Sequence, residues 1–231
     1  MRIAVIFHCF YFDLIDEFLV YFSKIGMPFS LFVTMPSDVY TKEEFDGAYK
    51  KITESYPDAV VISCRNYGAD IYPCFCVMDY ITRKNLHFDK YVKVHTKKSL
   101  RKKDKGIGER WRKDLCDAIF NNFQSNLELE GIISSLKQSH SFVKDTPKFR
   151  RDFMNPVFNF YGYSLVDVPK DLMTSCGTMF MIDGYIWEDF FTRSQKLQVS
   201  QEYFFSRKVC ISFERLWHIL PIFYKKPINF V

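Results

Sequence analysis

The feature that most constrains the fold is an alternation of short apolar runs with amphipathic segments through the first half of the chain. Arg2–Phe7 is a continuous apolar run with β-branched members, which is typical of a strand buried in a parallel sheet. A segment with apolar residues at helical spacing follows, and this order recurs three times with short connections. The alternation predicts an α/β fold with a mostly parallel central sheet, right-handed crossovers and flanking helices.

Capping and turn residues indicate where these elements end. Gly26 and Pro28 end the first helix, and Thr41 with Glu44 has the spacing of a capping box at the start of the second. We predict strands over residues 2–7, 29–34, 59–63 and 91–94, and helices over 13–24, 41–55 and 73–84.

The second half is less regular. Residues 146–157 are predicted to be basic and irregular, residues 158–168 are rich in aromatic side chains, and the tail ends without a helix cap. We predict helices over 111–123, 126–138, 188–195 and 202–222, and a strand over 176–182 entered through Gly177. We expect one domain over residues 1–231, and the uncapped tail is consistent with its being cut from a longer protein.

Composition and motifs exclude several classes of protein. Seven Cys without a C-x-x-C pair predict neither a zinc site nor a disulfide framework. The sequence has no G-x-G-x-x-G after the first strand and no P-loop motif. Acidic residues interrupt the first apolar run and no segment has transmembrane length, so we expect a cytoplasmic protein. A pI near 8.7 permits peripheral contact with the cytoplasmic face of a membrane.

Positive charge is concentrated just after the fourth predicted strand. Between Lys93 and Lys113, ten Lys or Arg face two carboxylates and give about +8, whereas the whole chain carries +5. Lys97 and Lys98 lie where the strand meets this basic loop. Because ligands of open α/β sheets bind beyond the carboxyl ends of the strands, the loop predicts a site for an anion such as a diphosphate. The alternative is a basic loop that is merely solvated.

Other polar residues follow the remaining strands. His8 and Thr34 come after the first two strands and are candidates for a pocket that holds a nucleotide base. Asn66, Gly68 and Asp70 lie between a strand and a helix, so their backbone amides are candidates for binding an anion or sugar hydroxyls. A structural turn in which Asp70 caps the helix is the alternative.

Several of these segments are similar to one known family. The segments His95-Thr96-Lys97-Lys98-Ser99, Gly177-Thr178-Met179-Phe180 and Glu214-Arg215-Leu216-Trp217 occur in that order, together with Asn66-Tyr67-Gly68-Ala69-Asp70. In these segments the chain resembles the rhamnan synthesis F family of bacterial polysaccharide glycosyltransferases. The resemblance implies a fold similar to the single-sheet, Rossmann-like type A glycosyltransferases. It also implies transfer of a sugar, often rhamnose, from a nucleotide-diphosphate donor to a glycan acceptor.

The resemblance also suggests roles for the two halves of the chain. Residues 1–123 would bind the nucleotide sugar and residues 124–231 the acceptor. Gly177, Thr178 and Arg215 join the candidate donor-binding residues. The family's N-R-G-R-D segment reads differently here, because Tyr67 and Ala69 replace both arginines. This departure leaves the donor sugar open.

Type A transferases usually hold the donor diphosphate through a metal bound by Asp-x-Asp after the fourth strand. Here His95-Thr96-Lys97 occupies that place, and a single imidazole is a poor magnesium site. We expect chemistry that requires no metal cofactor, with Lys97 and Lys98 offsetting the charge of the leaving group. The alternative is Mn or Mg held by His95 with Asp70 or Asp79.

An inverting transfer needs a base for the acceptor hydroxyl. Glu214 is the first candidate because its neighbours are apolar, and Asp183, after the second-half strand, is the next. A structural ion pair between Glu214 and Arg215 is the alternative. Trp111 and Trp217 are predicted to be core residues rather than sugar platforms.

Two other functions remain open. One is a non-catalytic domain of the same fold that binds a sugar nucleotide or glycan. The other is a polyanion-binding module that uses the basic loop, although we expect no nucleic-acid partner. A cysteine hydrolase is disfavoured because no Cys lies in a recognisable nucleophile turn.

Overall fold

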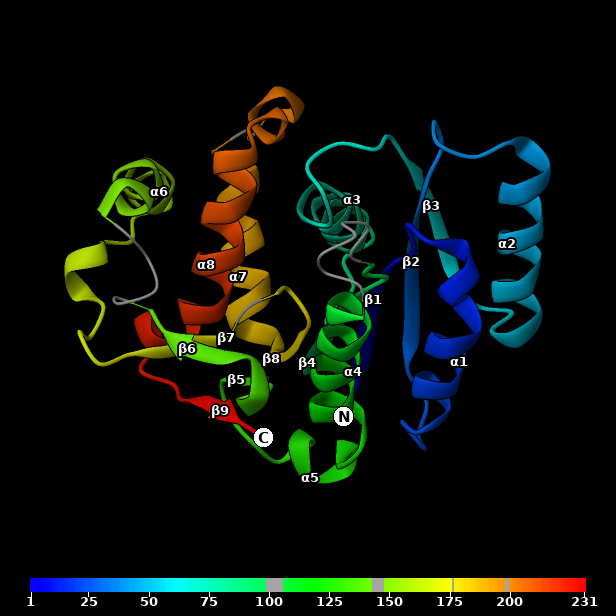
Figure 1. Cartoon of the computed structure of the whole chain (residues 1–231), viewed down its shortest axis with the longest axis horizontal. Helices are drawn as coiled ribbons and strands as arrows, with labels where there is room; N and C mark the ends of the chain where they lie inside the picture. The colour runs from blue at the N-terminus through cyan, green and yellow to red at the C-terminus, as the bar shows by residue number, and fades with distance from the viewer. Residues whose placement is uncertain (99–105, 143–147, 176, 198–199) are drawn as a thin grey trace.

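The computed structural model describes residues 1–98, 106–142, 148–175, 177–197 and 200–231 and is built around one mixed sheet (Figure 1). The strands of that sheet are β1 (Ile3–His8), β2 (Ser30–Pro36), β3 (Val60–Cys64), β4 (Lys90–His95), β5 (Ile132–Ser134), β8 (Phe180–Asp183) and β9 (Ile228–Phe230). A separate pair is formed by β6 (Ser139–Ser141) and β7 (Met173–Ser175).

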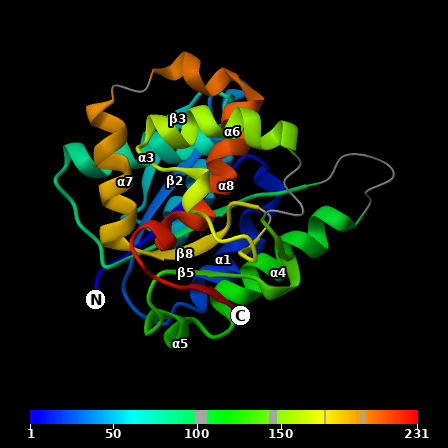
Figure 2. The same ribbon diagram turned by 90° about the vertical axis from the view of Figure 1, so that its left-hand side faces the viewer.

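The seven-stranded sheet has the order β3-β2-β1-β4-β8-β5-β9. Strands β1 to β4 are parallel to one another, whereas β8 runs antiparallel to both of its neighbours. The first four strands therefore end at the edge of the sheet where β8 begins. The N-terminus lies at the opposite edge, whereas β9 runs parallel to β1–β4 and brings the C-terminus to the edge where those strands end (Figure 2).

Helices cover both faces of the sheet. The α-helices are α1 (Ile15–Ser23), α2 (Lys42–Ser55), α3 (Ile71–Arg83), α4 (Ile107–Phe120), α5 (Phe123–Leu127), α6 (Lys148–Phe160), α7 (Gly184–Lys196) and α8 (Arg207–Phe223). In the described part of the chain, the short 3-10 helices are η1 (Phe12–Leu14), η3 (Leu136–Gln138), η4 (Leu165–Asp167) and η5 (Gln201–Phe205).

The alternation of side chains along the strands produces two separate cores. Val5 and Phe7 pack with α1, α2, α4 and α5 on one face, whereas Ala4 and Ile6 pack with α3, α6, α7 and α8 on the other. This is the period of two expected for a strand buried on both faces.

The predicted first half is confirmed. All four strands and the three helices between them occur within a few residues of the predicted bounds. The capping box is present, because Thr41 Oγ1 accepts from Glu44 N at 3.2 Å and Glu44 Oε2 accepts from Thr41 N at 2.9 Å.

Several predictions for the second half were wrong. The helix predicted over 126–138 is instead the end of α5, strand β5 and η3. The described part of the segment predicted to be irregular forms most of α6, and the tail adds β9 to the sheet. The strand predicted over 176–182 begins only at Phe180, and Cys176 lies outside the described residues. The helices predicted over 111–123, 188–195 and 202–222 correspond to α4, α7 and η5 with α8.

Candidate functional site

The polar residues predicted to gather at one edge of the sheet do so. His8 pairs in register with Thr34 of β2 and with His95 of β4, so the three residues lie in a row at the carboxyl edge. A cavity of about 250 Å³ opens there. It is lined by His8, Phe10, Tyr11, Asn66, Ala69, Asp70, His95, Thr96, Lys97 and Lys98.

Strand β8 brings part of the second half to the same edge. Because β8 is antiparallel to β4 and Phe180 pairs with Lys93, the residues just before β8 lie beside the end of β4. Thr178 Oγ1 is 3.5 Å from His95 Nδ1, and its backbone oxygen accepts from Lys93 Nζ at 3.0 Å. Gly177 and Thr178, two of the candidate donor-binding residues, are therefore next to the cavity.

Asp70 joins these segments into one cluster. Its Oδ2 lies 2.5 Å from Lys93 Nζ and 3.6 Å from His95 Nδ1, and it accepts a hydrogen bond from the Thr178 hydroxyl. Lys93 is 1% exposed, and its ammonium also lies 5.3 Å from the ring centroid of Trp217. Asp70 makes no capping bond to α3, so the capping alternative was wrong.

The electrostatics of this cluster follow from burial and from the Lys93 charge. Burial lowers the pKa of His95 to about 3 and that of His8 to about 4, so both rings are neutral near pH 7. Burial acts to raise the pKa of Asp70, but His95, Lys93 and Thr178 outweigh it and hold that pKa well below its usual range. The cluster therefore holds a fixed carboxylate beside neutral imidazoles.

The loop from Asn66 to Asp70 is shaped by its glycine. Gly68 has φ +69°, and a Cβ there would lie 2.6 Å from Tyr72 Cβ. The backbone nitrogens of Ile71 and Tyr72 donate to Gly68 O at 3.0 and 3.3 Å, so these two amides of the first turn of α3 are already used. Tyr67, at one of the departures from the family segment, stacks on Tyr72 with centroids 4.3 Å apart.

Thr96 fixes the loop after β1. Its Oγ1 accepts hydrogen bonds from the backbone nitrogens of Phe10 and Tyr11, both at 2.8 Å. His8 is fixed in turn by a hydrogen bond of 3.0 Å between its Nδ1 and Thr34 Oγ1. Thr34 thus supports the cavity through His8 rather than lining it.

The two lysines predicted to bind a diphosphate line the cavity and also contact the protein. Lys97 Nζ lies 4.2 Å from the ring centroid of Trp111, and Lys98 forms an ion pair with Asp13. Arg112 binds both carboxylate oxygens of Glu17 at 2.8 and 2.7 Å and donates to Lys97 O. The basic residues at positions 99–105 lie outside the described residues.

Glu214 lies at the margin of the cluster. Its Oε1 accepts from Gly177 N at 3.0 Å, and His218 one turn further along α8 contacts Gly177 O. Gly177 has φ +90°, a conformation that glycine adopts without strain. Helix α8 therefore holds the segment before β8. Its Glu214, the first candidate for the base, contacts Gly177, the residue that precedes Thr178.

Three predicted roles do not fit the geometry. Asp183 lies at the opposite edge of the sheet, where it pairs with Lys90 at 2.5 Å and accepts from Gly131 N at 2.6 Å. Arg215 is buried and contacts His140 of β6, so it neither lines the cavity nor makes the ion pair with Glu214 considered above. Asp79 forms an ion pair with Arg83 near the far end of α3, away from His95.

Sequence reasoning missed Lys93 and Arg112 as site residues, because both were counted only as part of the basic loop. Lys93 carried a signal, since it is a charged residue between Val92 and Val94 in an apolar strand. Trp217 is fully buried, as expected for a core residue, and Trp111 is partly buried. Trp111 packs against Lys97, which lines the cavity.

Within the described residues, no group of three or more His, Cys, Asp or Glu side chains has an arrangement that would hold a metal ion. None of the helices in the same part of the chain combines the length and apolar character needed to cross a bilayer.

Comparison with known proteins places the chain in a family. No curated protein gives a significant match to the sequence. Residues 1–216 of the 231 match the family described as Rhamnan synthesis protein F. The match includes the loop at Asn66–Asp70, the end of β4 and Glu214, and so covers the cavity and its margin. The chain therefore belongs to the rhamnan synthesis protein F family.

Proposed function

We propose that the chain is a glycosyltransferase that moves a sugar from a nucleotide-diphosphate donor to a glycan acceptor. The observation that carries this proposal is the cavity at the carboxyl edge of β1–β4, where Lys97 and Lys98 lie beside Asp70 and two neutral histidines. Membership of a polysaccharide-synthesis family supports it, and rhamnose is the sugar that the family's description suggests. The parallel order of β1–β4 is consistent with a type A glycosyltransferase fold.

In the proposed reaction the acceptor oxygen bonds to the anomeric carbon as the bond from that carbon to the phosphate oxygen breaks. The electron pair leaves on the diphosphate, whose charge Lys97 and Lys98 offset. Inversion follows from in-line attack on the face opposite the leaving group. Glu214 takes the acceptor's proton as the general base. Asp70 is too acidic to serve as a base, so its role is to orient a sugar hydroxyl.

The direct test of donor binding is a thermal-shift panel of UDP-, GDP- and dTDP-sugars, each with and without Mn. A donor should raise the melting temperature without Mn, because the lysines supply the positive charge that a metal would otherwise provide. Lys97→Ala combined with Lys98→Ala should abolish the shift.

The matched control is Lys42→Ala with Lys50→Ala, which removes two exposed charges from α2. This variant should bind the donor as the wild type does. If the Lys97 and Lys98 variant also binds normally, the proposed donor site is wrong. A shift that appears only with Mn would contradict the metal-independent reaction.

A non-catalytic role in binding sugar nucleotides or glycans is the second candidate. It is favoured by the engagement of Asp70 with Lys93 and of Lys98 with Asp13, because a ligand must compete with these contacts. Such a domain would show the thermal shift but would release no nucleoside diphosphate.

A further inference from the structure

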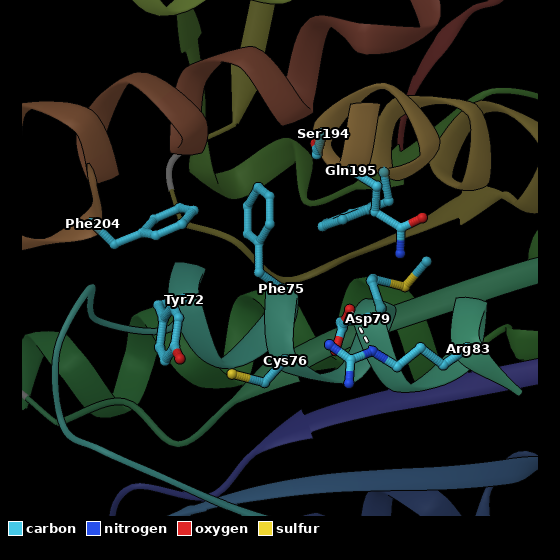
Figure 3. A pocket seen from close by; sticks show the side chains of 10 residues that line it. Tyr72, Phe75, Cys76, Asp79, Arg83, Ser194, Gln195 and Phe204 are labelled. Atoms are coloured by element: carbon cyan, nitrogen blue, oxygen red, sulfur yellow. Dashed lines mark hydrogen bonds and ion pairs between the residues drawn. The ribbon is translucent and has the colours of Figure 1, made fainter. Parts of the chain in front are cut away.

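A second cavity lies outside the proposed donor site. It has a volume of about 530 Å³, within the range of roughly 300–1,000 Å³ usual for ligand pockets. It lies between α3 and α7, and Phe204 of η5 contributes to one end (Figure 3). None of its lining residues lines the cavity at the carboxyl edge of the sheet.

The wall of this second cavity changes character along α3. Near the start of the helix it is aromatic, with Tyr72 and Phe75 facing Phe204, and the centroids of Phe75 and Phe204 are 4.6 Å apart. Further along it is polar, with Asp79 and Arg83 on α3 and Gln195 on α7 (Figure 3).

The polar end carries no net charge. Arg83 Nη2 lies 2.9 Å from Asp79 Oδ2, and the two side chains are 76% and 46% exposed. A pair of opposite charges offers both donors and acceptors to a ligand but does not attract ions of one sign. The cavity therefore suits a neutral ligand that presents apolar surface to one end and hydroxyl groups to the other.

We propose that this cavity binds a neutral oligosaccharide, namely a stretch of the acceptor glycan, and this inference rests on the proposed glycosyltransferase function. A sugar ring has an apolar face of C–H groups that packs on aromatic rings. Its hydroxyls bond to carboxylate, guanidinium and amide groups, the three that Asp79, Arg83 and Gln195 supply. From Tyr72 to Arg83 the helix rises roughly 16 Å, enough for several sugar units.

The position of the cavity agrees with an acceptor role. Tyr72 lines it and comes two residues after Asp70, which lines the donor cavity. At Gly68 a Cβ would lie 2.6 Å from Tyr72 Cβ and 3.1 Å from Phe204 Cβ, so the loop at residues 66–70 packs directly against the aromatic end. A glycan held between α3 and α7 therefore has one end close to the donor site.

The test is calorimetric titration of a neutral rhamnose tetrasaccharide into the protein without donor. Asp79→Ala with Arg83→Ala should weaken binding by about tenfold or more, because two charged hydrogen-bonding groups are lost. Gln195→Trp should do the same by filling the cavity. The matched controls are Lys50→Ala with Glu54→Ala, which removes an ion pair of the same i,i+4 spacing from α2, and Lys196→Ala, beside Gln195.

Every variant should retain the wild-type thermal shift with the nucleotide sugar. This second readout separates the two proposals. If the wild type binds no donor, the proposed function is contradicted. The tetrasaccharide titration tests the second cavity independently of that result. Equal tetrasaccharide affinity in all variants, or no binding to the wild type, would overturn the second site. Binding of decanol here, in place of the tetrasaccharide, would also overturn it, because the cavity would then be one for lipid chains.

Discussion

At the residue scale, Lys93 explains how a charged cluster is stable inside this fold. It contacts Asp70, from the loop after β3, and Thr178, from the segment before β8, while it is itself part of β4. Removing one partner of a buried ion pair costs about 3–5 kcal/mol, because the other charge is left without compensation. Sequence periodicity could not predict this pair, since Asp70 lies 23 residues away and approaches Lys93 only when the sheet forms.

The role proposed for Glu214 is tested at the same scale. Glu214→Gln retains the shape and the hydrogen bond from Gly177 N but cannot accept a proton. Turnover should fall by roughly 10²–10⁴, while donor affinity changes by no more than a few-fold. Steady-state kinetics with the donor that gives the largest thermal shift will measure this. Glu202→Gln in η5 is the control and should be fully active, and normal turnover in Glu214→Gln would exclude Glu214 as the base.

Buried histidines predict how stability depends on pH. Burial lowers the pKa of His8 and His218 to about 4 and that of His95 to about 3, whereas an unfolded histidine titrates near 6.5. Between about pH 4 and 6.5 the unfolded chain therefore binds more protons than the folded chain. The free energy of unfolding falls as the pH drops below about 6.5. Urea unfolding from pH 7.5 to 5 should show an uptake of about three protons at pH 5.

The histidine contributions can be separated by substitution. His8→Gln should reduce the proton uptake by about one. The control Val20→Ala, which changes an exposed side chain without a titratable group, should leave it unchanged. Stability that is independent of pH over this range would contradict the neutral, buried state of these rings.

At the element scale, the strength of the local pattern decided what could be predicted. Each strand from β1 to β4 has five or more residues, and helices follow the first three, so periodicity located them. By contrast, β5 and β9 have three residues each, too few for a pattern to emerge. Helix α6 contains Pro156, and because proline normally disfavours a helix interior, this segment carries no clear helical pattern.

The segment before β8 provides a test of how that element positions the site. Gly177→Ala should destabilise the fold by about 1–2 kcal/mol, because alanine disfavours φ +90° and its Cβ would lie 3.0 Å from Leu115 Cδ1. It should also weaken donor binding by displacing Thr178. Gly47→Ala in α2 is the control, since a Cβ there meets nothing within 4 Å and should stabilise the helix. Equal stability of the two variants in urea would contradict this account.

At the scale of the whole molecule, the site lies at the junction between the two halves of the chain. Strand β4 is the last strand of the regular first half, and β8 of the second half pairs with it. Lys93 of β4 contacts Thr178, just before β8, although the two residues are 85 positions apart in the sequence. The sequence predicted the carboxyl edge and most of the residues on it, because parallel strands all end there. It could not predict that Asp183 leaves that edge, since this depends on the antiparallel direction of β8.

If this junction transfers sugar, the protein must release nucleoside diphosphate from the donor. The wild type is incubated with the donor that raises its melting temperature most and with a rhamnose oligosaccharide, and the released diphosphate is followed by ³¹P NMR. We expect release that depends on the acceptor and is lost in the Lys97→Ala, Lys98→Ala variant. Donor binding with no release for any donor would contradict the claim and identify a binding domain instead.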